Sequence, residues 1–410
     1  MLRFSAVFLV LWLAACSQQP VKPTTPPASK AACDCPPIQI PGTQVPPATI
    51  PPPEVKVPEY SLLRAASWED IDSFAQDDLT KAWGAWLQSC SALKTRQPWQ
   101  NACAAAFALS SPDNETIQAY FKQYFTVYRT TNLDGTDTGL ITGYYEPLLK
   151  GSRTKTDTYR YPLYGKPDDL ITVELGSLYP ELANKRVRGR LTGTKLVPYY
   201  NRGEIDLEQS PLQGRELLWV DDIIDLFFLQ IQGSGLIQLD NGEQVHVGYA
   251  DQNGQAYQSI GRLLIERGEL TADKASMQGI KNWARNNLDK LRDLLNSNPS
   301  YVFFRELPAG LPGPLGALGV PILAERAVAI DPRYVPLGAP VFLATTYPNS
   351  NKPLNRLMMA QDTGGAIKGG VRADFFWGAG FEAGRQAGAM KQRGRIWVLL
   401  PKEFQFTASK

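Results

Sequence analysis

The chain has 410 residues, enough for two or three ordinary domains, and its apolar and charged fractions, 43% and 20%, are those of a globular protein. Its net charge is +2 and it contains no basic run, which argues against nucleic acid as its main partner. One histidine is too few for a histidine-rich zinc site, and 34 glycines with 32 prolines favour short strands and turns over long helices. Carboxylates are therefore the groups from which we expect catalysis.

The first residues have the pattern of an exported lipoprotein. Arg3 precedes an apolar segment, Phe4–Ala15, that is too short to span a bilayer as a helix, so residues 1–15 are interpreted as a signal peptide. Leu13-Ala14-Ala15-Cys16 resembles the lipobox of bacterial lipoproteins, which implies cleavage before Cys16 and lipidation of its thiol. Because Ser17 is not the aspartate that tends to retain lipoproteins in the inner membrane, we expect a Gram-negative outer-membrane lipoprotein that faces the periplasm. An ordinary secretory signal with a chance cysteine is the alternative.

Residues 16–60 are rich in proline, threonine, alanine and valine and cannot bury a core. We expect a semi-extended tether that reaches on the order of 100 Å, at roughly 3 Å per residue. Cys33 and Cys35 lie in this segment, and the sequence leaves open whether they are free, paired with each other or cross-linked to another chain.

Three helices are expected at the start of the folded part. The first is Ser67–Leu93, with Ser67 as N-cap and Asp70 three residues later. The second runs from Pro98 to about Leu109, and the third covers Asp113–Phe125.

Two cysteines, Cys90 and Cys103, fall in the first two of these helical patterns. Since an exported compartment is oxidising, we predict that they form a disulfide that joins a helical hairpin.

The rest of the chain alternates short strand patterns with Gly, Asn and Asp turns, which suggests a barrel or sandwich. Gly139–Pro147 is a strand that ends at a proline. Phe227–Leu239 is expected as two strand halves around Gly-Ser-Gly. Further strands are expected at Val245–Tyr249, Asn298–Arg305, Ala327–Ile330, Pro340–Ala344, Leu357–Gln361, Ala373–Trp377 and Arg395–Leu400, and helices at Ser259–Arg267, Met277–Leu295 and Phe381–Met390.

Three aspartates, Asp331, Asp362 and Asp374, stand beside glycine or proline turns at the ends of short apolar runs. Each is also what a turn or helix cap would use. Three acids in one region, with Arg372 and Lys368 nearby in sequence, favour a site. Asp374 is the strongest candidate, because the apolar residues around it predict burial and a raised pKa, which a general acid needs.

Other residues have both a structural and a ligand-binding interpretation. Gln232-Gly-Ser-Gly235 is either a tight turn or a place where backbone amides approach a ligand. Tyr144 and Tyr145 either belong to the core or stack on sugar rings. His246 is interpreted as an ordinary strand residue, and Glu146 as solvated. The candidate substrate-binding set is Thr142, Gly143, Tyr144, Tyr145, Gln232, Gly233, Ser234, Gly235, Lys368 and Trp377.

Taken together, a set of motifs between about Trp68 and Pro401 closely resembles the MltA family, the membrane-bound lytic murein transglycosylases A. Its C-terminal part is similar to the 3D domain, whose three aspartates match the three named above. The motifs are Thr142-Gly-Tyr-Tyr145, Phe228-Leu-Gln-Ile-Gln-Gly-Ser-Gly235, Tyr249-Ala250, Ser259-Ile-Gly261, Asn298-Pro-Ser-Tyr-Val-Phe-Phe304, Asp362-Thr-Gly-Gly-Ala-Ile-Lys368 and Asp374-Phe-Phe-Trp-Gly378.

The resemblance implies a mainly β fold with attached helices: a double-psi β-barrel, a second β-barrel domain inserted into it, and a groove between them. It assigns residues 61–147 and 306–405 to the first domain and residues 148–305 to the second. It implies cleavage of the β-1,4 bond between N-acetylmuramic acid (MurNAc) and N-acetylglucosamine (GlcNAc) in peptidoglycan without water, giving 1,6-anhydro-MurNAc ends. Asp374 would be the single acid and base, Asp362 would tune or orient it, and Asp331 would support the strand ends. No metal or cofactor is required.

Two other functions fit much of the sequence. A non-catalytic lipoprotein that tethers the outer membrane to peptidoglycan would share the anchor, the tether and the sugar-binding groove. A muramidase that uses water would need two working carboxylates. The aspartate cluster argues against the first, because a binding protein does not need an acid in an apolar pocket.

Overall fold

The computed structural model describes residues 60–179, 182 and 187–406. The predicted signal peptide, Cys16, Cys33, Cys35 and nearly all of the predicted tether lie outside this described part. Within it, no helix is long and apolar enough to cross a bilayer.

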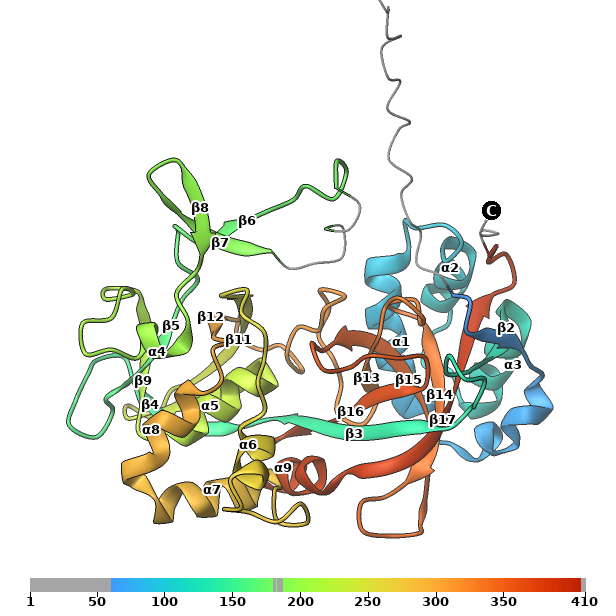
Figure 1. The fold of residues 1–410 in the computed structure, drawn as a ribbon. Helices are drawn as coiled ribbons and strands as arrows, with labels where there is room; N and C mark the ends of the chain where they lie inside the picture. Colours follow the sequence, from blue (N-terminus) through green and yellow to red (C-terminus); the bar gives the residue numbers. More distant parts are fainter. Residues whose placement is uncertain (1–59, 180–181, 183–186, 407–410) are drawn as a thin grey trace, which may run out of the picture. The chain divides into compact units, whose positions relative to one another are not determined.

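A closed barrel of six strands forms the first part of the fold (Figure 1). The strands follow the order β17-β14-β15-β13-β16-β3, and β3 pairs with β17 to close the barrel. Two neighbouring pairs, β13–β15 and β16–β3, are parallel, and the other four are antiparallel. The strands are β3 (Gly139–Glu146), β13 (Ala327–Ile330), β14 (Pro340–Thr346), β15 (Pro353–Thr363), β16 (Arg372–Ala379) and β17 (Lys391–Pro401). The mainly β fold expected from the sequence is confirmed.

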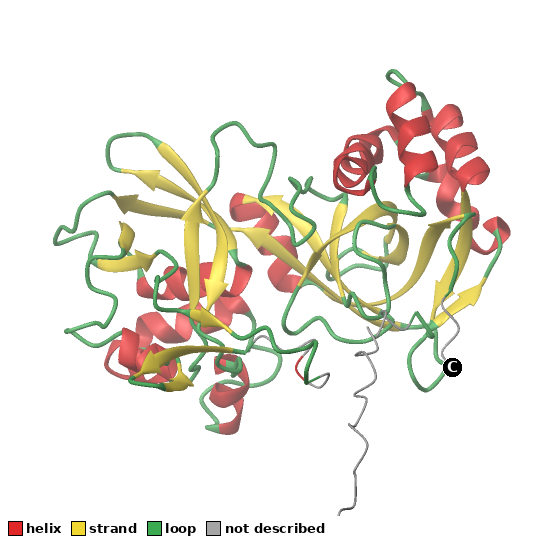
Figure 2. Cartoon of the chain, turned by 90° about the horizontal axis from the view of Figure 1, so that it is seen from above, coloured by secondary structure: helices red, strands yellow, loops and turns green. Residues whose placement is uncertain are grey.

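Three helices lie beside this barrel, and the same group is seen from above in Figure 2. They are α1 (Thr80–Leu93), α2 (Gln100–Ala108) and α3 (Asn114–Tyr124), and a disulfide between Cys90 and Cys103 joins α1 to α2. Trp86 is fully buried among them, and its indole donates a hydrogen bond to the Tyr120 hydroxyl. Two short strands, β1 (Leu63–Ala65) and β2 (Phe125–Thr130), extend the sheet beyond β17.

The single helix predicted over Ser67–Leu93 is wrong. The structure has a 3-10 helix, η1 (Trp68–Gln76), and α1, separated by Asp77 in an extended conformation. The cause is a tertiary contact, because the Asp77 carboxylate accepts hydrogen bonds from the Arg326 guanidinium at 2.7 and 3.0 Å. It also accepts one from the Leu357 amide at 2.8 Å, so the chain bends to meet the barrel.

A second, six-stranded sheet has its own apolar core. Its order is β12-β11-β10-β4-β9-β5, and an isolated bridge between Gly165 and Phe304 connects the ends of this order. The strands are β4 (Leu148–Ser152), β5 (Tyr161–Tyr164), β9 (Glu216–Val220), β10 (Ser234–Leu239), β11 (Gln244–Gln252) and β12 (Val302–Glu306).

The strand predicted over Phe227–Leu239 is wrong in its first half. Those residues belong to helix α5 (Ile223–Gln232), which the Asp222 carboxylate caps at the amides of residues 224 and 225. Gly233, with φ +82°, ends the helix in the left-handed region, and β10 starts at the next residue. A short, continuous apolar run does not distinguish a buried helix from a buried strand, and this run is buried on most sides.

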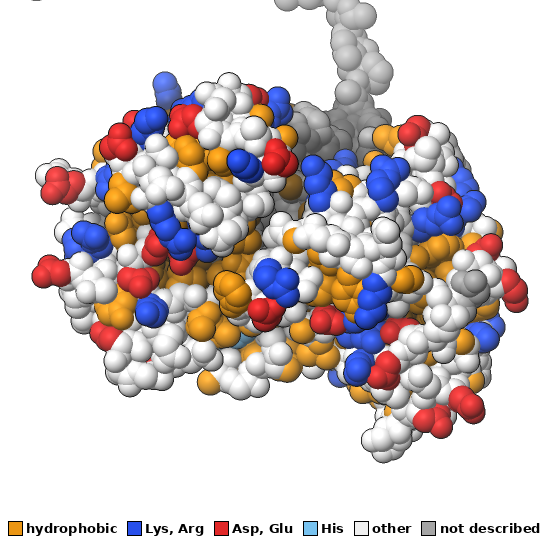
Figure 3. Space-filling model, turned by 90° about the horizontal axis from the view of Figure 1, so that it is seen from below, with side chains coloured by type: hydrophobic (Ala, Val, Ile, Leu, Met, Phe, Trp, Pro, Cys, Tyr) orange, Lys and Arg blue, Asp and Glu red, His pale blue; other side chains and the backbone are white. Residues whose placement is uncertain are grey.

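The remaining elements complete the described part. A small sheet contains β6 (Ile171–Thr172), β7 (Arg188–Thr192) and β8 (Lys195–Pro198). The helix predicted over Met277–Leu295 is interrupted at Asn287, with φ −140°, which divides it into two helices. The helices are α4 (Arg202–Ile205), α6 (Ile260–Glu266), α7 (Met277–Asn286), α8 (Leu288–Asn296) and α9 (Gly380–Ala389). On the face in Figure 3, basic side chains are interspersed with acidic ones.

Candidate active site

Strand β3 has two chemically different faces. Ile141 and Tyr145 lie in the main apolar core of the barrel, whereas Tyr144 belongs to a separate small cluster that includes Ala329 and Phe376. Because successive side chains of a strand point to opposite faces, Thr142 shares the face of Tyr144. The second face therefore carries the polar residues of β3 away from the barrel core.

Four residues form a row across this face. Ala329 on β13 is paired with Asp362 on β15 and with Asp374 on β16, and Asp374 is paired with Thr142 on β3. Paired residues of adjacent strands point to the same side, so both carboxylates project from one face. With one strand between them, their Cα atoms are about 10 Å apart. The barrel thus brings together two of the three predicted acids.

Asp374 is partly exposed, and its carboxylate has two close polar neighbours. The Thr142 hydroxyl donates a hydrogen bond to Oδ1 at 2.5 Å, and Arg372 lies two residues earlier on the same strand. Burial raises the pKa of Asp374, and the Asp362 carboxylate adds to this effect. The Thr142 hydrogen bond and the Arg372 charge lower the pKa but do not cancel the rise. A raised pKa keeps the acid protonated to a higher pH, as a general acid requires.

Asp362 is held by donors on both of its oxygens. Oδ1 accepts hydrogen bonds from the amides of Ala317 at 3.0 Å and Thr363 at 2.9 Å, and Oδ2 accepts one from the Tyr144 hydroxyl at 3.0 Å. Burial, followed by the charges of Asp362 and Asp374, raises the pKa of Tyr144 well above its ordinary value. Tyr144 therefore stays protonated and serves as a donor, and Asp362 is fixed in place.

Asp331 occupies a different environment at the end of β13. It is only 1% exposed and forms an ion pair with Arg333 at 2.5 Å, while the Gly369 amide donates to it at 2.9 Å. Burial alone would raise its pKa, but the hydrogen bonds from Arg333 and Gly369 outweigh burial and lower it. The Asp331 carboxylate is therefore ionised and bonded to Arg333 and Gly369, which fits a supporting role.

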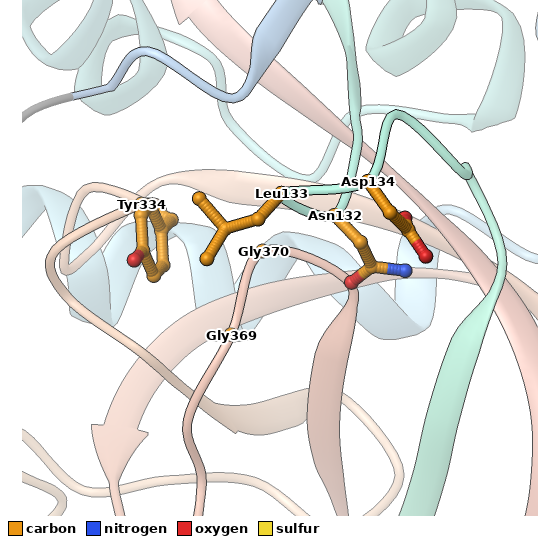
Figure 4. Close-up of a pocket in the computed structure, with 6 residues that line it drawn as sticks. All are labelled: Asn132, Leu133, Asp134, Tyr334, Gly369 and Gly370. Carbon is orange, nitrogen blue, oxygen red and sulfur yellow. The ribbon is translucent and has the colours of Figure 1, made fainter.

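A cavity of about 310 Å³ is lined in part by Gly369, whose amide donates to Asp331, and Asp374 is not among its lining residues. The Leu133 and Tyr334 side chains face it in Figure 4, and Leu133 is 84% exposed. Its lining residues are Asn132, Leu133, Asp134, Tyr334, Gly369 and Gly370, so none of the predicted substrate-binding residues contributes to it.

Several residues that were predicted to bind substrate pack inside the barrel instead. Tyr145 and Trp377 lie in the barrel core, and the Trp377 indole donates to Met390 Sδ at 3.3 Å. A Cβ atom at Gly143 would lie 2.6 Å from Trp377 Nε1, so this glycine permits close packing. Lys368 is exposed in the loop between β15 and β16.

The Gln232-Gly-Ser-Gly235 segment runs from the end of α5 into β10 and contacts β3. Gln232 Oε1 accepts a hydrogen bond from the Tyr145 amide at 3.0 Å, which fixes the strand next to Tyr144. A Cβ atom at Gly235 would lie 2.9 Å from the Pro147 carbonyl oxygen, and Ser234 is buried. The segment therefore supports the site indirectly, because it holds β3 in position.

Two features escaped the sequence interpretation. Glu146 was expected to be solvated but is 3% exposed, because its Oε1 lies 2.5 Å from Nε2 of His246 on β11. Arg372 donates to Thr142 Oγ1 at 2.9 Å, and the alternation of β16 alone did not identify this contact across strands. Among the described residues, no group of three or more His, Cys, Asp or Glu side chains is placed to hold a metal ion.

Comparisons with known proteins agree with this arrangement. The family model for the MltA specific insert domain matches residues 140–305, and that for the 3D domain matches residues 326–400. The crystal structure of MltA from Neisseria gonorrhoeae, monoclinic form, is 40% identical, with a TM-score of 0.74 over 84% of this chain and 94% of that chain. The chain belongs to the MltA family.

Two further relatives extend the comparison. Membrane-bound lytic murein transglycosylase A of Escherichia coli K12 is 34% identical over 267 residues, which are 63% of this chain and 65% of that protein. The chain thus spans about two thirds of the length of this curated relative. A structure of E. coli MltA with bound chitohexaose is 27% identical, with a TM-score of 0.60 over 78% of this chain and 90% of that one.

Proposed function

We propose that this MltA family member is a lytic transglycosylase that cleaves the β-1,4 MurNAc-GlcNAc bond of peptidoglycan without water, in cell-wall turnover. The observation that carries the proposal is the contrast among its three aspartates. Asp374 is partly exposed and has a raised pKa, whereas Asp331 is buried with a lowered pKa and Asp362 has donors on both oxygens. Environments that separate the pKa values of neighbouring acids are typical of acid-base catalysis.

In the proposed reaction, protonated Asp374 donates its proton to the glycosidic oxygen, and the bond from that oxygen to C1 of MurNAc breaks. The Asp374 carboxylate then takes the proton of the MurNAc 6-hydroxyl, and the oxygen of that hydroxyl forms a bond to C1. The product ends in 1,6-anhydro-MurNAc and the acid is regenerated. Since the attacking hydroxyl belongs to the substrate, its proximity is already provided, and a second working carboxylate is unnecessary.

The relatives' names and the chitohexaose complex of E. coli MltA support a glycan substrate. The glycan would lie along the face that carries Asp374 and Tyr144. We also propose the division into domains at residues 61–147 with 306–405 and at 148–305. It is supported by the strands, because the six barrel strands lie in the first set and those of the second sheet lie within residues 148–305, apart from Glu306 at the end of β12.

Mass analysis of products from purified peptidoglycan tests the reaction. The wild-type protein should release muropeptides one water lighter than hydrolytic products. Asp374→Asn should reduce the rate by roughly 10²–10⁴-fold while the protein still folds and binds glycan strands. Products with ordinary reducing ends would indicate a muramidase, and glycan binding without any product would indicate a tethering lipoprotein.

We further propose that Cys16 carries a lipid anchor that holds the protein at the periplasmic face of the outer membrane. The lipobox-like sequence and the relatives' description as membrane-bound support it. Cys16→Ala should release the protein from outer-membrane fractions without detergent, whereas the control Cys33→Ala should stay attached. Equal partitioning of both variants with the membrane would contradict the anchor.

A further inference from the structure

Arg372, Thr142 and Asp374 form a chain of hydrogen bonds with a fixed direction. The Arg372 guanidinium donates from Nη2 to Thr142 Oγ1 at 2.9 Å, and Thr142 Oγ1 lies 2.5 Å from Asp374 Oδ1. A guanidinium has donors only, and a hydroxyl has a single hydrogen. Thr142 accepts from Arg372 and keeps its single hydrogen for donation, and among the described residues the acceptor of that hydrogen is Asp374 Oδ1.

This direction distinguishes the two oxygens of Asp374. Oδ1 already accepts the Thr142 hydrogen, and a proton on Oδ1 would place two hydrogens between the same pair of oxygens. The acid proton therefore belongs on Oδ2.

Arg372 is itself held by the backbone of two strands. Its Nη1 donates to the carbonyl of Ala373 at 2.6 Å and to that of Leu140 on β3 at 3.3 Å. The cation therefore stays near the row of site residues whether Asp374 is protonated or ionised. The positive charge opposes the effect of burial on the pKa of Asp374.

The other ionisable groups around Asp374 come from three other strands of the barrel. The Asp362 carboxylate on β15 raises the pKa of Asp374, and the Tyr144 hydroxyl on β3 is engaged with Asp362. Lys391 on β17 is paired with Thr142 but is exposed. Thr142 and Arg372 are thus the groups that counter both burial and Asp362.

We propose that Thr142 and Arg372 are positioning residues that keep the acid proton of Asp374 on Oδ2 and stabilise the carboxylate after that proton has left. The proposal rests on the acid-base function of Asp374 and assigns Thr142 to the acid, where the sequence placed it in the substrate-binding set. An acid that must donate a proton and then recover one needs both forms to be accessible, and the two residues stabilise the ionised form.

Thr142→Val, which keeps the shape but lacks the hydroxyl, tests this against Thr142→Ser, which keeps it. In Thr142→Val the Asp374 carboxylate loses a donor, so its pKa should rise, as measured by carbon-13 NMR of the labelled side chain. The alkaline limb of the pH-kcat profile should move to higher pH and kcat should fall about tenfold, with a smaller change in KM. Thr142→Ser should keep the wild-type profile.

Arg372 provides a second, independent pair of variants. Arg372→Gln removes the charge and should raise the pKa of Asp374 in the same direction, whereas Arg372→Lys should do so less. An unchanged Asp374 pKa in both Thr142→Val and Arg372→Gln would overturn the inference, as would a Thr142→Ser profile as altered as that of Thr142→Val. If the wild-type protein released no anhydro products, the proposed function would fail instead, and the NMR measurement would still test the hydrogen-bond chain.

Discussion

The buried ion pair between Asp77 and Arg326 should be a main stabilising link between the N-terminal helices and the barrel. Each side chain is 5% exposed, and two hydrogen bonds of 2.7 and 3.0 Å connect them. Asp77→Ala leaves the guanidinium buried with only the carbonyl oxygens of Leu357 and Asp78 as partners, and it leaves the Leu357 amide without its acceptor. Removal of one partner of a buried pair costs about 3–5 kcal/mol of unfolding free energy.

Urea titration followed by tryptophan fluorescence and circular dichroism measures this loss. The neighbouring Asp78→Ala is the matched control, because among the described residues the Asp78 side chain bonds to the exposed Thr80 and Lys81, and it should leave the midpoint nearly unchanged. The double variant Asp77→Leu with Arg326→Met should recover part of the lost stability, since no charge then stays buried unpaired. A loss below about 1 kcal/mol in Asp77→Ala, or a double variant less stable than the single one, would refute the reasoning.

Three further predictions concern the barrel, the helices beside it and the candidate site. Gly143→Ala should lower the unfolding free energy by about 1–3 kcal/mol in urea titration, because the new methyl group would lie 2.6 Å from Trp377 Nε1; unchanged stability would contradict this packing. Thiol mapping of non-reduced protein should find Cys90 joined to Cys103, and replacement of both by serine should cost about 3 kcal/mol, whereas two free thiols would disprove the pairing. Asp374→Asn should raise the unfolding free energy at neutral pH, because the folded protein disfavours the charged carboxylate. That gain should shrink once the pH falls below the raised pKa of Asp374 and vanish below the ordinary pKa of an aspartate, and a variant less stable at every pH would contradict it.

The barrel strands were largely predictable because their residues carry local signals. Ala327–Ile330 was predicted with the bounds it has, and the other four C-terminal strands were located but are longer in the structure. The error at Phe227 arose because α5 is buried on most sides, so its apolar run has no polar stripe to reveal a helical period.

The residue types of the site could be predicted from the sequence, but the contacts between those residues could not. Tyr144 and Tyr145 are neighbours in sequence, yet the first donates to Asp362 and the second packs in the barrel core. Which of them faced the site depended on the register of β3 against β16. That register pairs residues more than two hundred positions apart. The burial of Glu146 likewise depends on its contact with His246, which lies on a strand that is distant in sequence.

The late position of strand β16 has a consequence for how the protein is made. Thr142 and Asp374 are separated by 232 residues, which a ribosome adds in on the order of 10 to 50 s. Throughout that interval β3 has neither β16 nor β17 beside it, whereas all six strands of the second sheet are synthesised within it, the last ending at Glu306. We therefore expect the second sheet to fold first and the row that contains Thr142 and Asp374 to be assembled last. A chain cut short before β16 would then contain a folded second sheet but would lack Asp374.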